Sequence, residues 1–138
     1  MSKWTPEQRQ AIDSRGQNLL LSAAAGSGKT AVLVQRVIDL IIKDRIDIDR
    51  LLIVTFTQAA AAEMRERINK AIFEELQKAP VEIQKDLRRQ LTLLSRASIS
   101  TIHSFCREVL KKYFFLIDID PNFRVGDESE SAIIKMGV

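Results

Sequence analysis

Leu19-Leu-Leu-Ser-Ala-Ala-Ala-Gly-Ser-Gly-Lys-Thr30 is the stretch with the strongest pattern in this sequence. Its first three residues form an apolar run that predicts a buried strand. Small residues follow from Ala23 to Gly28, and Lys29 and Thr30 open a segment with the apolar periodicity of a helix. This order of strand, small-residue loop and helix is the context that a phosphate-binding P-loop requires.

The residue types of this loop suit nucleotide phosphates. Small side chains let consecutive backbone N–H groups point at phosphate oxygens, and the start of the helix adds the positive end of its dipole. Lys29 supplies a cation for the β- and γ-phosphates, and Thr30 supplies a hydroxyl for Mg²⁺. Ala23 stands where the usual pattern has its first glycine. We predict a nucleotide site with Mg²⁺ here, and the alternative is a chance Gly/Ser turn before a helix.

A second apolar and β-branched run, residues 51–56, predicts a strand that is buried on both faces and therefore parallel. Between the two runs, apolar rows that begin at Leu33 and Val34 predict a helix that ends near Asp44. A strand, a helix and a strand of these lengths form a right-handed βαβ unit. The sequence therefore predicts an α/β fold with a parallel sheet, flanking helices and a ligand site at the carboxyl ends of the strands.

The amino-terminal residues predict a short helix over residues 6–14. Thr5 suits the cap, Pro6 suits the first helical position, and Gln8 has the spacing of a capping-box partner. On residue types alone, Gln8 fits a cap better than a ligand contact. Trp4 fits a hydrophobic staple better than a recognition residue.

Further elements follow along the chain. Residues 59–78 predict a long helix, and Pro80 separates it from a second helix over residues 81–95. Residues 97–102 favour a short strand, and residues 103–115 favour a helix whose inner face includes Phe105 and Val109. The buried row of the long helix is expected to comprise Met64, Ile68 and Ile72.

Length and composition limit the classes of protein. The 138 residues suit one domain, and 46% hydrophobic residues favour a globular fold. The sequence has no run close to the ~18 apolar residues of a membrane span, and no signal peptide is evident. A single cysteine, Cys106, excludes an internal disulfide and a cysteine-based zinc site. We therefore expect a cytoplasmic protein without a membrane partner.

The net charge of +3 is less informative than its distribution. Residues 88–112 carry six cations against a single anion, whereas residues 117–131 carry five anions against one cation. A basic stretch suits contact with a polyanion such as nucleic acid. A solvated helix face would explain these charges equally well.

Four stretches resemble, in order and spacing, the motifs of superfamily 1 helicases of the UvrD/Rep type. The Q motif, motif I, motif Ia and motif Ib correspond to Thr5-Pro-Glu-Gln8, Ala23-Ala-Ala-Gly-Ser-Gly-Lys-Thr30, Thr55-Phe-Thr-Gln-Ala-Ala-Ala-Ala-Glu-Met-Arg-Glu-Arg-Ile68 and Thr101-Ile-His-Ser-Phe-Cys106. The run of four alanines and the segment Asp120-Pro-Asn-Phe-Arg-Val125 are most similar to the AddA-type helicase–nuclease branch. Gln58 departs from the pattern, because the family usually has Asn there.

The resemblance implies a partial RecA-like P-loop NTPase domain over residues 1–116, followed by the start of an inserted helical subdomain over residues 117–138. It implies an ATP-dependent DNA helicase/nuclease that uses ATP and Mg²⁺. Such a protein translocates on single-stranded DNA and unwinds duplex DNA during double-strand-break repair and recombination. The implied partners are single-stranded DNA, duplex DNA and an AddB-like subunit.

The resemblance also assigns roles to single residues. Gln8 would read the adenine edge, and Lys29 and Thr30 would be the catalytic residues, with Thr30 as the Mg²⁺ ligand. The nucleotide would be held by Gln8, Ala23, Ala24, Ala25, Gly26, Ser27, Gly28, Lys29 and Thr30. DNA would be contacted by Phe56, Thr57, Gln58, Thr101, His103 and Ser104, since aromatics stack on bases and hydroxyls suit phosphates. Phe105 is expected in the core, and Cys106 is expected as a small buried residue.

The residues needed for turnover are not evident in the sequence. ATP hydrolysis needs a strand-borne Asp-Glu pair and arginines for the γ-phosphate. Asp127-Glu128 follows a short polar segment and is expected at the surface. We therefore expect an amino-terminal fragment that binds ATP and DNA without unwinding. The alternative is a non-catalytic P-loop module for nucleotide or DNA, while a nucleotide kinase is disfavoured because no arginine-rich lid is apparent.

Overall fold

The computed structural model describes residues 4–24, 26–120, 122–126 and 128–137. The chain forms two compact units, Met1–Ile102 and His103–Val138, and each is described by itself. The first unit contains the helices α1 (Pro6–Asp13), α2 (Lys29–Ile42), α3 (Gln58–Lys78) and α4 (Val81–Leu93), the strands β1 (Leu52–Thr55) and β2 (Ser98–Thr101), and the short 3₁₀ turns η1 (Ile48–Arg50) and η2 (Leu94–Arg96).

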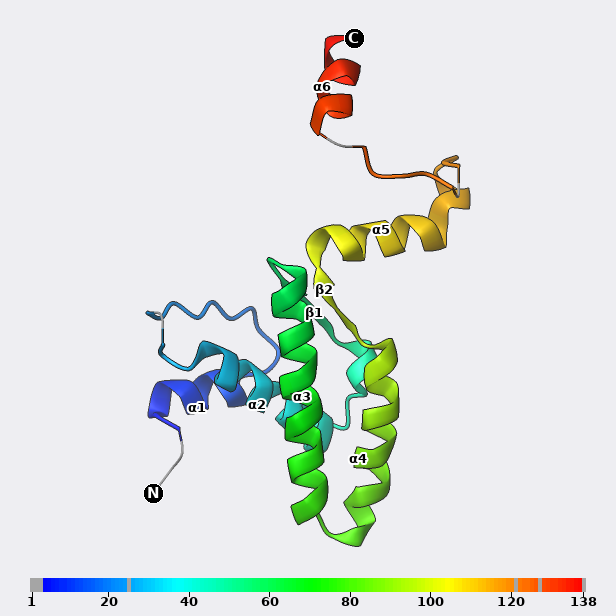
Figure 1. Cartoon of the computed structure of the whole chain (residues 1–138). Helices are drawn as coiled ribbons and strands as arrows, with labels where there is room; N and C mark the ends of the chain where they lie inside the picture. The colour runs from blue at the N-terminus through cyan, green and yellow to red at the C-terminus, as the bar shows by residue number, and fades with distance from the viewer. Residues whose placement is uncertain (1–3, 25, 121, 127, 138) are drawn as a thin grey trace. The chain divides into compact units, whose positions relative to one another are not determined.

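The strands β1 and β2 pair in parallel, with Leu52 opposite Ser98 and Thr55 opposite Thr101. The chain connects them through α3 and α4, as a parallel pair requires a crossover (Figure 1). The two predicted strands and the mixed α/β class are therefore confirmed. Burial on both faces was wrong for β1, because Ile53 is buried in the core while Leu52 and Val54 are exposed.

The expected strand over residues 19–21 is absent from the described structure. The three leucines have no regular secondary structure, and Leu20 is 93% exposed. The described sheet contains only β1 and β2, so this run has no neighbouring strand to supply ladder hydrogen bonds. The predicted βαβ unit that begins with residues 19–21 is therefore wrong for the described residues, and the parallel crossover runs instead through α3 and α4.

The core of the first unit forms around α3. Its predicted row of Met64, Ile68 and Ile72 is buried, and α4 packs alongside α3 (Figure 1). Apolar side chains from α2, η1, α4 and both strands complete this cluster. Burial of an isoleucine stabilises the fold by roughly 1.5–3 kcal/mol, so the fully buried Ile68 and Ile72 make α3 a major apolar contributor.

Helix α1 packs on α2 through a smaller apolar cluster. The cluster contains Ala11, Ile12 and Val32, and Trp4 packs at its edge. The predicted capping box is confirmed: Gln8 N–H donates to Thr5 Oγ1 at 3.3 Å, and Thr5 N–H donates to Gln8 Oε1 at 3.0 Å. Helix α2 ends at Ile42, close to its predicted end.

The second unit includes most of α5 (Ile102–Tyr113), the turn η3 (Phe114–Leu116) and α6 (Glu128–Met136). None of the described residues of α5 is buried. Phe105 is only half-buried and Val109 and Cys106 are exposed, so the three expectations of burial were wrong. Helical periodicity indicates an apolar face, but within this unit the described residues do not cover it.

Two predictions fall on residues outside the described ranges. Ala25 of the expected nucleotide site is one, and Asp127 of the expected surface pair is the other. Among the helices of the described ranges, none combines the length and the hydropathy needed to cross a lipid bilayer.

Candidate functional site

The loop before α2 depends on two glycines with left-handed backbone. Gly26 has φ of +79°, and Gly28, the N-cap of α2, has φ of +81°. A residue with a Cβ is strained in this conformation. The nearest atom to a Cβ built on Gly28 would be Gln8 Nε2 at 3.5 Å, an ordinary contact, so backbone conformation rather than crowding accounts for glycine. The two glycines therefore let the chain turn sharply just before the first N–H groups of α2.

Lys29 closes this loop on itself. Its ammonium donates to the carbonyl of Ala23 at 2.5 Å and to the carbonyl of Ala24 at 2.8 Å. The cation is thus held at the loop between the end of the leucine run and the first turn of α2. An anion at the helix start would meet both this charge and the backbone N–H groups.

Gln8 joins α1 to the same loop. Its Nε2 donates to the carbonyl of Ser27 at 3.1 Å while its Oε1 completes the capping box. The Ser27 hydroxyl is buried and has no hydrogen-bond partner among the described residues. A pocket of about 110 Å³ is lined by these two residues together with Ala23 and Lys29. An unsatisfied buried hydroxyl is unfavourable, so the loop has a polar group that a phosphate oxygen could satisfy.

Thr30 lies near the carboxyl end of β1. It lines a pocket of about 300 Å³ with Thr55, Phe56 and residues of α3, including Glu63 and Arg67. On α3, Arg67 donates to the Glu63 carboxylate, four residues earlier, at 2.6 and 2.9 Å. The structure therefore brings the proposed metal-ligand hydroxyl to the strand edge at which a ligand site was expected.

The expected DNA-contacting residues of the first unit gather where β1 and β2 end. Phe56 is fully exposed, and Thr57 caps α3 by accepting a hydrogen bond from Ala60 N–H at 3.1 Å. Gln58 Nε2 lies 3.5 Å from the hydroxyl of Thr101, which is buried. The edge at the ends of β1 and β2 therefore exposes the ring of Phe56, while the buried Thr101 contacts Gln58 from the inner side.

His103 and Ser104 belong to the second unit, where they lie in the first turn of α5. His103 is exposed and Ser104 is half-buried. Both therefore occupy the amino-terminal end of a helix, a position that suits phosphate contacts.

Arg65 is a positioning residue that the sequence analysis missed. Its guanidinium donates to the carbonyls of Leu94, Ala97 and Ile99, with distances of 3.0 Å to Ala97 and 3.4 Å to Ile99. It thereby fixes the start of β2 to α3. Its spacing could have indicated this role, because Arg65 follows the buried Ala61 by four residues and therefore lies on the inward side of α3.

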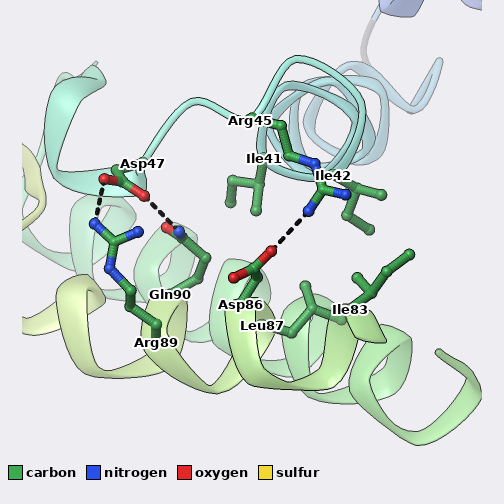
Figure 2. A pocket seen from close by; sticks show the side chains of 9 residues that line it. All are labelled: Ile41, Ile42, Arg45, Asp47, Ile83, Asp86, Leu87, Arg89 and Gln90. Atoms are coloured by element: carbon green, nitrogen blue, oxygen red, sulfur yellow. Dashed lines mark hydrogen bonds and ion pairs between the residues drawn. The ribbon is translucent and has the colours of Figure 1, made fainter. Parts of the chain in front are cut away.

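A second missed cluster lies between α2 and α4, in a cleft of about 90 Å³ (Figure 2). Asp47 accepts hydrogen bonds from Gln90 Nε2 at 2.7 Å and Arg89 at 2.6 Å, and Arg45 pairs with Asp86 at 2.8 Å. The hydrogen bond from Gln90, supported by Arg89, holds the pKa of Asp47 below its ordinary value. Since the charges pair with each other, this cleft stabilises the approach to β1 rather than offering free groups to a ligand.

The comparison with protein families matches residues 4–137 to the UvrD/REP helicase N-terminal domain. Among curated relatives, an ATP-dependent helicase/nuclease subunit from Clostridium novyi (strain NT) is 65% identical over 135 residues, which cover 96% of this chain. The corresponding proteins from Alkaliphilus metalliredigens (strain QYMF) and Syntrophomonas wolfei are each 62% identical, over 99% and 100% of this chain. The matched region is 11% of each of these relatives.

Proposed function

Because the chain belongs to the family of UvrD/REP helicase N-terminal domains, we propose that it is the ATP-binding part of an AddA-type, ATP-dependent DNA helicase/nuclease. The chain spans 11% of the length of the relatives, so their helicase and nuclease activities are carried over here as part of the proposal. The proposal includes a RecA-like domain over residues 1–116, the start of a helical insertion over residues 117–138, and an AddB-like partner protein.

The geometry of the loop before α2 is the observation that supports ATP binding most directly. Gly28 turns the chain so that the N–H groups of Lys29 and Thr30 open the helix, and the Lys29 ammonium is already at the loop. The triphosphate would replace the two carbonyls as the partner of Lys29 and would satisfy the buried Ser27 hydroxyl. Bound Mg²⁺, held by Thr30, would neutralise charge on the β- and γ-phosphates.

The nucleotide site is tested by Lys29→Ala. Removing this charge-assisted contact should weaken Mg²⁺-ATP binding by about 1.5–3 kcal/mol, or roughly tenfold or more. Lys85→Ala, on the exposed side of α4, is a control that should leave the affinity unchanged. Calorimetric titration of the three proteins provides the measurement, and equal affinities of wild type and Lys29→Ala would refute the site.

We also propose weak, sequence-independent binding of single-stranded DNA at the edge that carries Phe56, Thr57 and Gln58. The exposed ring of Phe56 can stack on any base, and the helix start at Thr57 suits a phosphate. Fluorescence anisotropy should show affinity that falls with salt, because bound phosphates release counterions. Phe56→Ala should weaken binding several-fold, whereas Phe73→Ala, another exposed phenylalanine, should not. Salt-independent binding, or equal effects of the two variants, would contradict the proposal.

The chain on its own is proposed to bind ATP without helicase-like turnover or unwinding. Thr30 is the one protein ligand that we propose for Mg²⁺. Phosphoryl transfer also needs a positioned water and an arginine on the developing charge. Phosphate release with excess single-stranded DNA tests this. DNA-stimulated turnover that Lys29→Ala abolishes would show that other residues complete the site.

A further inference from the structure

Helix α5 has an apolar side and a basic side. His103, Arg107 and Lys111 follow one another at intervals of four residues, so they form one row along the helix, with an axial rise of about 6 Å between successive members. All three side chains are exposed. Val109 and Tyr113 belong to the opposite, apolar side of the helix. The basic row therefore exposes two side chains that are charged at neutral pH, Arg107 and Lys111, behind a histidine.

The two cations of this row are not used by the fold itself. Among the described residues, neither Arg107 nor Lys111 forms an ion pair or a side-chain hydrogen bond. Arg89, from the same basic stretch of residues 88–112, differs from them, because it pairs with Asp47 at 2.6 Å. The structure thus divides the basic stretch into a cation that stabilises the first unit and two cations of α5 that are available to an external anion.

Lys112 is the neighbouring cation on α5, but it lies outside the row. One residue turns a helix by about 100°, so Lys111 and Lys112 point to different sides. The Lys112 ammonium lies 5.3 Å from the centre of the Tyr113 ring, within the range of a cation–π interaction. Glu108, the one acidic residue in the sequence of α5, precedes Lys112 by four residues, the spacing of a favourable ion pair. Lys112 is therefore a charge-matched comparison for Lys111.

The basic row begins at the residues that are expected to contact DNA. His103 and Ser104 form the first turn of α5, and Arg107 and Lys111 follow on the next two turns of the same side. The phosphates of a strand held at the first turn continue beyond it, and cations spaced by one turn can meet them in succession. The planar guanidinium of Arg107 suits bidentate contact with a phosphate, while the Lys111 ammonium acts as a point charge.

We propose that Arg107 and Lys111 bind the phosphate backbone of single-stranded DNA and extend along α5 the contact expected at His103 and Ser104. This assignment rests on the proposed DNA binding and adds two residues to it. Contacts to phosphates carry no sequence information, so the row increases affinity equally for all sequences. The side chains of this row are therefore a nucleic-acid contact rather than only a solvated helix face.

Fluorescence anisotropy of labelled oligothymidine across a salt series tests the proposal on the full 138-residue chain. Arg107→Gln and Lys111→Gln should each weaken binding several-fold and reduce the slope of log affinity against log salt by about 0.7, the contribution of one phosphate contact on a single strand. Lys112→Gln should leave both quantities unchanged, and Arg107→Lys should retain the slope because it retains the charge. Glutamine has a helix propensity close to that of arginine and lysine, so circular dichroism should show the same helix content in all variants.

The outcomes separate this row from the DNA edge at Phe56. Equal slopes for wild type and the double variant Arg107→Gln/Lys111→Gln, or an equal loss in Lys112→Gln, would overturn the assignment. If Phe56→Ala still weakened binding in that case, the proposed DNA edge would stand without α5. Displacement of the strand by polyglutamate as effective as that by unlabelled oligothymidine would favour an acidic polypeptide and would also overturn the assignment. If wild type binds no DNA, the proposed DNA binding itself fails, and this inference fails with it.

Discussion

Two apolar runs in the same unit behave differently. Residues 19–21 and 51–56 both predict strands, yet only the second run forms one, β1. β1 has β2 as a ladder partner and α3 against one face, whereas the described structure gives residues 19–21 neither a ladder partner nor burial. The difference teaches that composition indicates a tendency to be buried, while a strand also needs a neighbour for its backbone hydrogen bonds.

The same comparison explains how the candidate nucleotide loop is held. Its preceding run supplies no sheet contact in the described residues, so two side chains from helices fix the loop instead. Gln8 of α1 bonds the carbonyl of Ser27, and Lys29 of α2 bonds the carbonyls of Ala23 and Ala24. The loop therefore depends on the packing of α1 on α2 rather than on β1 and β2.

The largest expected difference is between a substitution in the core around α3 and one in residues 19–21, measured by the free energy of unfolding. Ile68→Ala removes a fully buried side chain of α3 and should lower the free energy of unfolding by about 2–5 kcal/mol. Leu20→Ala changes an exposed residue and should alter it by less than about 0.5 kcal/mol. Urea denaturation of both variants measures the difference. A comparable loss from Leu20→Ala would mean that residues 19–21 are buried in solution.

An intermediate effect is expected from Gln90→Leu, which tests the polar support of β1. Gln90 is buried, and its Oε1 accepts a hydrogen bond from the N–H of Ile48, just before β1, at 2.9 Å. Leucine would leave this N–H unpaired, at a cost of about 1–3 kcal/mol.

Gln84→Leu is the matched control on the same helix. Its amide donates to the carbonyl of Ala79 in a part-buried position, so water can replace the lost contact. Urea midpoints should fall clearly more for Gln90→Leu than for Gln84→Leu. Equal midpoints would show that the Gln90 contact does not support β1.

A smaller effect is expected in the acid dependence of stability. The folded pKa of Asp47 lies below its ordinary value, so its contribution is complete above about pH 4 and is lost as the pH falls through the lower folded pKa. Asp47→Asn should therefore be less stable at neutral pH and should lose less stability between pH 5 and 2. Urea midpoints of both proteins between pH 5 and 2 measure this loss of stability. Parallel curves of midpoint against pH would contradict the assigned contribution of Asp47.

Local patterns predicted local structure well. The capping box of Thr5 and Gln8 and the buried row on α3 depend on spacings of three or four residues, and both are observed. The contacts of Arg65 and Gln90 join residues about 30 to 40 positions apart, which no local pattern encodes. Burial of Cys106 was wrong for a related reason: periodicity gives the apolar face of a helix, and tertiary packing determines whether it is covered.

The candidate site likewise combines features that are local in sequence with features that depend on tertiary packing. The glycines, Lys29 and Thr30 were identified from the motif alone, because a phosphate loop is local in sequence. The link from Gln8 to Ser27 depends on how α1 packs against α2, so it could not be predicted from the sequence.

The most direct test of the account is amide hydrogen exchange over residues 22–32, with and without saturating Mg²⁺-ATP. The account predicts that ATP slows exchange at the amides of the loop and first turn of α2, around Gly28, Lys29 and Thr30. Amides in the core of α3 should change little. The protection should be reduced in Lys29→Ala at the same ATP concentration. ATP binding with unchanged exchange in this segment, or with protection confined to other elements, would contradict the assignment of this loop as the nucleotide site.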